Sequence, residues 1–390
     1  MSTPPAPPVP RSVPRPLPIR WRDRLLVPPA PRDTSVITGF PARIPERILL
    51  EIPDPVSGQA TPVAVWHYPR GPVAGPRVAE APADSTDPAS AGHRAPIVAI
   101  HGFRGDHHGL ALLADCLPGE EIFLPELPGF GDSPAFPDAE HTLTHYAAAV
   151  GSAVEALGLV PPAETGGTGQ HGRRAAPNPA GHQPRPTLLG HSFGSVIASH
   201  LATEAPDRWD GLVLLNPICE TALTADDSTA KMLMSRIAEG YYETSAALPD
   251  RLGHALLSSP LVVWITGTVM AKTTDRHTLA YLHDQHQNYF SSFDHRTVLV
   301  EAYRASTTGS VLDVAEQLRL PVLLVAGADD ELGSVRGQRK LARRIGRASP
   351  SVQLEILNGV GHLIHYERAP ETAELIRAFR SASESSRSGG

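Results

Sequence analysis

The chain has 390 residues, a formal net charge of −7 and two cysteines. This length suits one large α/β domain that carries insertions. The acidic balance argues against a basic surface, so we expect neither a nucleic-acid partner nor a membrane partner. Cys116 and Cys219 stand far apart without metal-ligand spacing, and we interpret both as buried thiols.

The hydropathy of the sequence predicts the cellular location of the protein. No apolar run approaches the ~20 residues that span a bilayer, and the first residues lack the apolar core of a signal peptide. We therefore expect a cytoplasmic protein. The sequence carries no signal for its oligomeric state.

The first part of the chain predicts a tail, a hairpin and an insert. Residues 1–40 are rich in proline and arginine, a composition that buries little apolar surface and predicts a disordered tail. Apolar runs at 47–52 and 62–68, separated by polar turn residues, predict an antiparallel hairpin. Residues 71–95 and, further on, 161–186 lack apolar periodicity, so we interpret them as flexible inserts.

Short apolar runs then alternate with helical patterns. The runs interpreted as strands are residues 97–100, 121–124, 187–189, 212–215, 322–326 and 352–356. The helical patterns are residues 110–116, 142–157, 195–204, 335–345 and 370–382. This alternation predicts the α/β class, with a mostly parallel, doubly wound sheet covered on both faces. We assign 45–215 and 309–382 to this core and 383–390 to a disordered tail.

Residues 216–308 interrupt the alternation with a mostly helical pattern. We interpret them as a helical cap over the carboxyl edge of the sheet. Each large side chain in this stretch is more typical of core packing, but we expect the set to include the wall of a pocket. The set is Met232, Met234, Tyr241, Tyr242, Trp264, Met270, Tyr281, Tyr289, Phe290 and Phe293.

The sequence GHSFG at 190–194 carries the most specific chemical signal. A predicted strand precedes it and a predicted helix follows it, which is the context of a nucleophile elbow. In such a turn Ser192 lies at the tip with strained backbone angles, and the N–H of Phe193 faces the group that the serine attacks. The alternative is a glycine-flanked serine in an ordinary loop.

A serine hydroxyl needs a neighbouring base, and the base needs an acid to orient it. In open α/β sheets the catalytic groups lie beyond the carboxyl ends of the strands. The strand at 322–326 is followed by Asp329 and Asp330, and the strand at 352–356 is followed by His362. The order along the chain is serine, acid, histidine.

That order, together with HGFRG at 101–105, PGFGDS at 128–133, GHSFG and the GH pair at 361–362, resembles the α/β-hydrolase superfamily. Its capped, esterase-like and C–C-hydrolase-like members are the most similar. The resemblance covers about residues 45–380 apart from the two inserts, and it implies the α/β-hydrolase fold.

The resemblance also implies a role for each matching residue. Ser192 corresponds to the nucleophile, His362 to the general base and later acid, and Asp330 to the orienting acid in preference to Asp329. Some members place the acid after the preceding strand, where Glu220 is the nearest carboxylate. The main-chain N–H groups of Phe103 and Phe193 correspond to the oxyanion hole. Glu126 stands where the family usually has Asp, at a structural position.

We therefore expect a serine hydrolase that cleaves an ester, thioester or related acyl bond of a small, largely apolar substrate, without cofactor or metal. The alternatives are a C–C bond hydrolase or cofactor-free perhydrolase of the same fold, and an inactive hydrolase fold that serves as a binding module. Aspartate-dependent dehalogenase and epoxide hydrolase reactions are disfavoured by the serine. The histidine pairs 107/108, 141/145 and 362/365 lack convincing metal spacing, and we interpret them as packing or solvated side chains.

Overall fold

The structure is a computed structural model that describes residues 29–71, 94–161, 185–219 and 229–388. Its centre is an eight-stranded sheet with the strand order β1-β2-β4-β3-β5-β6-β7-β8. The strands are β1 (Glu46–Pro53), β2 (Ala60–Tyr68), β3 (Ile97–Ile100), β4 (Ile122–Pro125), β5 (Thr187–His191), β6 (Gly211–Leu215), β7 (Val322–Gly327) and β8 (Val352–Leu357).

The predicted hairpin is present as β1 and β2, which pair antiparallel along their whole length. Strand β2 also runs antiparallel to β4, whereas the remaining adjacent pairs, β4–β3, β3–β5, β5–β6, β6–β7 and β7–β8, are all parallel. Strands β3 to β7 are buried along their whole length, because helices cover both faces of the sheet. The carboxyl ends of the parallel strands therefore meet at one edge of the sheet.

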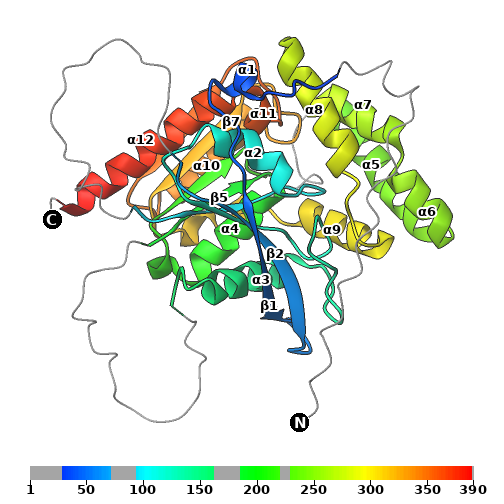
Figure 1. Cartoon of the computed structure of the whole chain (residues 1–390), viewed down its shortest axis with the longest axis horizontal. Coiled ribbons are helices and arrows are strands. Elements are labelled where there is room, and N and C mark those ends of the chain that lie inside the picture. Colours follow the sequence, from blue (N-terminus) through cyan, green and yellow to red (C-terminus); the bar gives the residue numbers. More distant parts are fainter. Residues whose placement is uncertain (1–28, 72–93, 162–184, 220–228, 389–390) are drawn as a thin grey trace, which may run out of the picture.

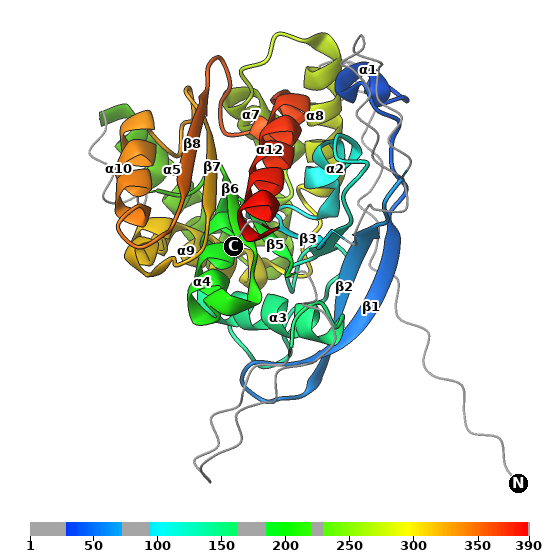
Figure 2. The same ribbon diagram turned by 90° about the vertical axis from the view of Figure 1, so that its left-hand side faces the viewer.

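Two apolar clusters fill the two faces of the sheet. One face carries α2 (Ala111–Asp115), α11 (Ile364–Glu367) and α12 (Ala369–Ser388). The other carries α3 (Leu143–Ala156), α4 (Phe193–Glu204) and α10 (Val335–Ile345). Figure 2 shows α12 on one side of the strands and α3, α4 and α10 on the other. The predicted α/β-hydrolase fold, with its mostly parallel, doubly wound sheet, is confirmed.

Helices follow one another between β6 and β7. They are α5 (Thr229–Ala247), α6 (Asp250–Leu257), α7 (Pro260–Met270), α8 (Arg276–Tyr289) and α9 (Arg296–Thr308). Figure 1 shows α5 to α8 gathered together at one end of the sheet. We call these five helices of the described chain, together with the segments that join them, the helical insertion. They lie within the segment 216–308 in which the sequence predicted helices.

Both predicted tails were too long. Residues 29–40 of the predicted tail 1–40 are described, and they include α1 (Ser35–Thr38). Ile37 and Phe40 pack against the α2 and α12 face, so a few apolar residues hold this segment to the core. The predicted tail 383–390 is helical as far as Ser388, where α12 ends, and Glu384 in this helix binds Arg94 at 2.6 Å. Residues 1–28, and most of the inserts 71–95 and 161–186, lie outside the described residues.

One apolar segment is longer than the apolar runs that the sequence analysis predicts. Asp250–Met270 covers 21 residues, and the most apolar 18-residue window within it has a mean hydropathy of 1.4, so by length and composition alone it could cross a membrane. The structure divides this segment into α6 and α7 at Ser258 and Ser259, with Pro260 as the first residue of α7. Only 22% of the segment's apolar window is buried, so much of α7 forms an exposed apolar surface.

Candidate active site

Ser192 lies at the tip of the turn between β5 and α4, with φ 54° and ψ −121°. Left-handed φ values are uncommon for a residue with a side chain, and here the neighbouring structure enforces this one. A Cβ at Gly190 would collide with the carbonyl of Gly194, and a Cβ at Gly194 would collide with the carbonyl of Ile100. The two glycines therefore permit the tight strand-turn-helix geometry that the sequence predicted.

Ser192, His362 and Asp330 come together at the carboxyl edge of the sheet. The Oγ of Ser192 lies 2.8 Å from Nε2 of His362, and Nδ1 of His362 lies 3.0 and 3.1 Å from the two carboxylate oxygens of Asp330. The exposed fractions of these residues are 8%, 4% and 5%. Asp329 is exposed, so the structure brings Asp330 rather than its neighbour to the histidine. Glu220, the other acid considered, lies outside the described residues.

Burial and the neighbouring carboxylates act on the pKa of His362 in opposite directions. Burial lowers the pKa of His362, but the charge of Asp330, its hydrogen bond and the charge of Glu331 raise it, and the net pKa lies above the ordinary value. Since the Nδ1–H donates to Asp330, the Nε2 lone pair faces the Ser192 hydroxyl. The arrangement can remove a proton from Ser192 and hold the resulting imidazolium.

Asn216 supports this site, and the sequence analysis did not single it out. It follows β6 with φ 41°, and its Nδ2 donates to the carbonyls of Gly361 and His362 at 2.9 and 2.8 Å. Its Oδ1 accepts from the N–H of Gly327 at 2.7 Å. One buried carboxamide thus joins the ends of β6 and β7 to the loop that carries the histidine. Its position directly after a buried strand was the only available sequence signal.

Two main-chain N–H groups lie beside the serine. Phe193 is the first residue of α4, where N–H groups lack a partner within the helix. A Cβ built on Gly102 would lie 3.2 Å from the Cβ of Ser192, which places the Phe103 turn against the serine. Within the described ranges, neither the N–H of Phe103 nor that of Phe193 has a hydrogen-bond acceptor. Both donors are therefore free to bind a developing oxyanion.

Aromatic side chains of the helical insertion surround the Phe103 ring. Tyr242 lies 5.7 Å from it and Tyr303 6.0 Å, measured between ring centroids, and the two tyrosines stack on each other at 4.0 Å. Phe130, from the PGFGDS loop, approaches the same ring edge-on at 6.4 Å. Tyr242 belongs to the set expected to line a pocket, whereas Tyr303 was not in that set.

Of the other histidine pairs, 141/145 has hydrogen-bond partners of its own, whereas His365 packs against a neighbouring ring. His141 binds Glu301 through Nδ1 at 2.8 Å, and His145 binds the carbonyl of Glu140 at 2.7 Å. His365 lies buried with its ring 3.9 Å from that of His191. Burial, followed by the charge of His362, lowers the pKa of His191 to about 3, so this imidazole is neutral and packs behind the site.

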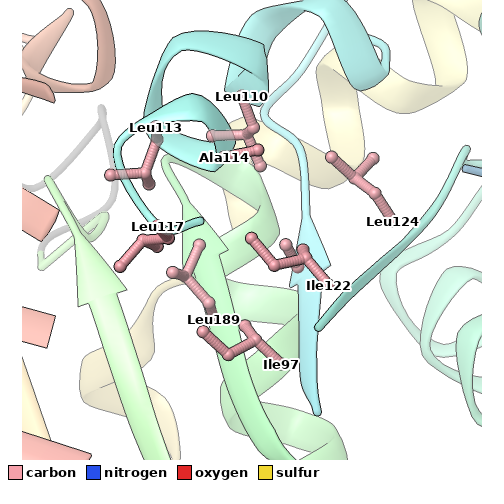
Figure 3. A pocket seen from close by; sticks show the side chains of 9 residues that line it. Ile97, Leu110, Leu113, Ala114, Leu117, Ile122, Leu124 and Leu189 are labelled. Atoms are coloured by element: carbon pink, nitrogen blue, oxygen red, sulfur yellow. The ribbon is translucent and has the colours of Figure 1, made fainter. Parts of the chain in front are cut away.

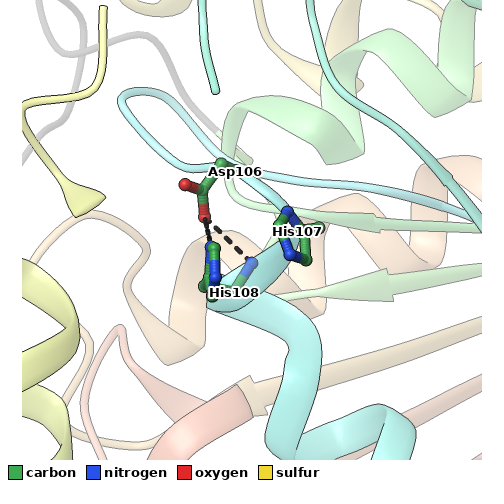
Figure 4. Close-up of side chains that lie close together, drawn as sticks. All are labelled: Asp106, His107 and His108. Atoms are coloured by element: carbon green, nitrogen blue, oxygen red, sulfur yellow. Dashed lines mark hydrogen bonds and ion pairs between the residues drawn. The ribbon is translucent and has the colours of Figure 1, made fainter. Parts of the chain in front are cut away.

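His107 and His108 form a group with Asp106 that has enough donor atoms for a metal ion, and the sequence analysis had not included the aspartate. Asp106 instead caps the 3-10 helix η3 (His107–Leu110), and its Oδ1 accepts from the main-chain N–H of His108 (Figure 4). The two imidazole planes are tilted by 38° with their centroids 3.8 Å apart, and Nδ1 of each ring already has a carboxylate partner: Glu126 at 2.7 Å for His107 and Asp106 at 3.2 Å for His108. We therefore assign the group no metal.

Glu126 holds the loop below the site. Its Oε1 accepts from Nδ1 of His107 at 2.7 Å, and its Oε2 accepts from the N–H of Asp132 at 2.6 Å. A Cβ at Gly131 would touch the same carboxylate, so the glycine makes room for the longer acid. The substitution of Glu for the family's usual Asp is thus accommodated locally.

A small pocket between the sheet and α2 is purely apolar. It is lined by side chains such as Ile97, Leu113, Ile122 and Leu189, which point toward one another in Figure 3. No polar group of the described chain lines it, so it belongs to the core and not to the site.

Comparisons with solved structures show the same fold. A putative lipase from Acinetobacter baumannii is 16% identical with a TM-score of 0.58, over 88% of this chain and 93% of that one. An esterase from Thermogutta terrifontis is 18% identical with a TM-score of 0.56, over 87% and 99%. A haloalkane dehalogenase from Bradyrhizobium elkani is 13% identical with a TM-score of 0.54, over 88% and 100%. At such identities the likeness shows the fold alone.

A search of curated proteins found no match. The sequence model of the family described as serine aminopeptidase, S33, matches residues 173–369, which is just over half of the chain and includes Ser192, Asp330 and His362. The chain therefore belongs to the serine aminopeptidase S33 family and is an α/β-hydrolase.

Proposed function

We propose that the protein is a serine hydrolase that cleaves an ester, thioester or related acyl bond through an acyl-enzyme. The observation that carries this proposal is the continuous series of hydrogen bonds from the Ser192 hydroxyl through His362 to Asp330. A buried carboxylate, an imidazole and a strained serine in this order are the parts that nucleophilic acyl transfer requires.

In the proposed reaction, Oγ of Ser192 attacks the substrate carbonyl while Nε2 of His362 takes the hydroxyl proton. Asp330 stabilises the imidazolium without taking the proton itself. The imidazolium then gives its proton to the leaving alcohol or thiol, and the acyl group remains on Ser192. Water activated by His362 releases the acid and restores the serine.

The N–H groups of Phe103 and Phe193 would bind the oxyanion of both tetrahedral intermediates. Two fixed donors aimed at the developing charge typically lower a barrier by several kcal/mol in a site that excludes water. The low exposure of Ser192 supports such exclusion.

We further propose that the helical insertion acts as a cap and sets the substrate. The ring of Phe103 and those of Tyr242 and Tyr303 lie together next to the site, which favours an apolar acyl group. A serine at the nucleophile position 192 favours a reaction through a serine nucleophile, although the same fold also occurs in a haloalkane dehalogenase.

The test is a kinetic panel on the purified chain, with Ser192→Ala as the control. p-Nitrophenyl esters of increasing acyl length should be hydrolysed, with kcat/KM passing through a maximum that reports the length of the pocket. Amino-acid p-nitroanilides examine the activity in the family's name, and vinylogous diketones and peracid formation examine the same-fold alternatives. If only one of these alternatives proceeds, the ester proposal is wrong. Absence of every turnover in folded protein favours a binding module.

A further inference from the structure

Arg104 is a buried arginine that has no carboxylate partner among the described residues. Only 3% of it is exposed. Its guanidinium instead donates to three oxygens of the helical insertion: the carbonyl of Phe290 at 3.1 Å, the hydroxyl of Tyr242 at 3.4 Å and the carbonyl of Leu257 at 2.8 Å. The guanidinium carbon also lies 4.5 Å from the centroid of the Phe290 ring.

The placement of these acceptors explains how a lone buried charge is stabilised. Leu257 is the last residue of α6, and Phe290 directly follows α8. The carbonyls at the end of a helix lack partners within the helix and carry the negative end of its dipole. Arg104 therefore satisfies the carboxyl ends of two helices of the insertion at once, and it stacks on the aromatic ring at the end of one of them.

The backbone of Arg104 connects this contact to the serine. Gly105 donates to the carbonyl of Gly102 at 3.0 Å, so residues 102–105 form a turn, and Arg104 adopts φ 60° at its third position. That position usually holds glycine or asparagine, because side chains disfavour positive φ. Phe103, the proposed oxyanion donor, is the second residue of the turn. The turn that contains Phe103 is thus tied to the insertion through the arginine side chain.

A second contact links the same loop to the same helix end. The ring of His108 stacks on that of Tyr289, the last residue of α8, with centroids 3.5 Å apart and planes 12° apart. Two side chains of the 101–108 loop thus hold the end of α8, one by hydrogen bonding and one by stacking.

We propose that Arg104 is a positioning residue: by tying the 102–105 turn to α6 and α8, it holds the Phe103 N–H beside Ser192. The proposal rests on the proposed acyl-transfer function for its catalytic consequence. Its structural part, the coupling between the turn and the insertion, stands independently of that function.

The experiment compares the full-length wild type with Arg104→Gly, Arg104→Asn and Arg104→Lys. Glycine and asparagine both tolerate positive φ, so these variants remove the side chain while the turn stays accessible. Lysine keeps the charge but loses the fork that reaches several acceptors, and should rescue only part of the function. Arg43→Gln is the matched control, because Arg43 likewise donates to carbonyls, among them those of Ala114 and Leu117, but does so away from the site.

Hydrogen exchange measured by mass spectrometry tests the coupling directly. In Arg104→Gly and Arg104→Asn, exchange should rise together in the peptides that cover 101–108 and 286–293, and Arg43→Gln should change neither. Unchanged exchange at 101–108 in folded variants would overturn the proposal, whatever the activity.

Kinetics on the folded fraction test the consequence. We expect kcat for an ester, and the rate of labelling by a fluorophosphonate, to fall by about 10- to 100-fold in both variants while KM changes little, because only the tetrahedral state needs the Phe103 N–H. Wild-type rates in both variants would overturn the catalytic role. A wild type that reacts with neither reagent would refute the serine hydrolase function, and the exchange data would then still decide whether Arg104 couples turn and insertion.

Discussion

The side-chain amide of Asn216 holds His362 by its main chain: Nδ2 donates to the His362 carbonyl at 2.8 Å, while Nε2 of the same histidine reaches Ser192 at 2.8 Å. Asn216 thus fixes the position of the histidine loop relative to the ends of β6 and β7, although it takes no part in the proposed proton transfers. Substitutions of Asn216 therefore test how strongly the site depends on the hydrogen bonds that hold the histidine loop.

Asn216→Ala should lower both stability and turnover. The loss leaves two buried carbonyls and the N–H of Gly327 without their partner, which we expect to cost about 2–3 kcal/mol of unfolding free energy. Displacement of His362 should reduce kcat at least about 10-fold. Urea unfolding and ester kinetics measure the two effects. Asn216→Gly separates the lost amide from the positive φ, and the exposed Asn358→Ala on the histidine loop is the control that should behave as wild type.

Asp330→Asn should change the pH dependence of activity in a defined direction. His362 must be neutral to accept the serine proton, and its raised pKa places the acidic limb of the wild type above the ordinary histidine value of about 6.5. Removing the carboxylate charge removes the largest contribution that raises this pKa. The limb should therefore move to lower pH while the plateau of kcat/KM falls by about 10⁴-fold. A pH profile between about pH 5 and 9 measures both. A limb that stays in place would show that Asp330 does not act on the titrating group.

Gly194→Ala should destabilise the protein because the new Cβ would meet the carbonyls of Ile100 and His101. Overpacking against main chain typically costs about 1–3 kcal/mol, and the serine turn should shift with it. Gly240→Ala is the matched control: no atom lies within 4 Å of its Cβ position in α5, so alanine should stabilise that helix by about 0.5–1 kcal/mol. Equal effects of the two changes on urea unfolding would contradict the packing argument.

Asp115 predicts part of the pH dependence of stability. Burial raises its pKa to about 6, against hydrogen bonds from Arg43 and Thr34 that lower it. A carboxyl group whose folded pKa is raised contributes stability that is present below its unfolded pKa of about 3.9 and is lost as the pH rises through about 6. The unfolding free energy of Asp115→Asn should therefore rise relative to that of the wild type, by up to about 3 kcal/mol, as the pH increases from about 4 to 7. Urea unfolding at several pH values checks this, and a constant difference between the two proteins would refute it.

The sequence predicted the fold and the central residues of the site for the same physical reason. The ends of parallel strands share one edge of the sheet, so Ser192, Asp330 and His362, each placed after a strand, were expected to meet there. Glycine at 190 and 194 marked the tight turn in advance. In both cases the pattern of neighbouring residues in the sequence was enough to predict where the side chains lie.

Other features could not be predicted, because they depend on partners far away along the chain. The carboxamide of Asn216 binds main-chain atoms, which carry no residue identity that a sequence pattern could reveal. Arg104 finds its acceptors at helix ends whose arrangement is set by tertiary packing. The serine-rich end of α12 continues the helix and carries an ion pair from Glu384 to Arg94, a contact between distant parts of the chain that local composition does not reveal.

Intact-mass spectrometry after fluorophosphonate treatment, with wild type beside Ser192→Ala, tests the central claim most directly. An activated serine should give the wild type one adduct, and Ser192→Ala none, while ester hydrolysis by the variant falls by at least about 10³-fold. No adduct on folded wild type, or the same adduct on Ser192→Ala, would contradict the assignment of Ser192 as the nucleophile.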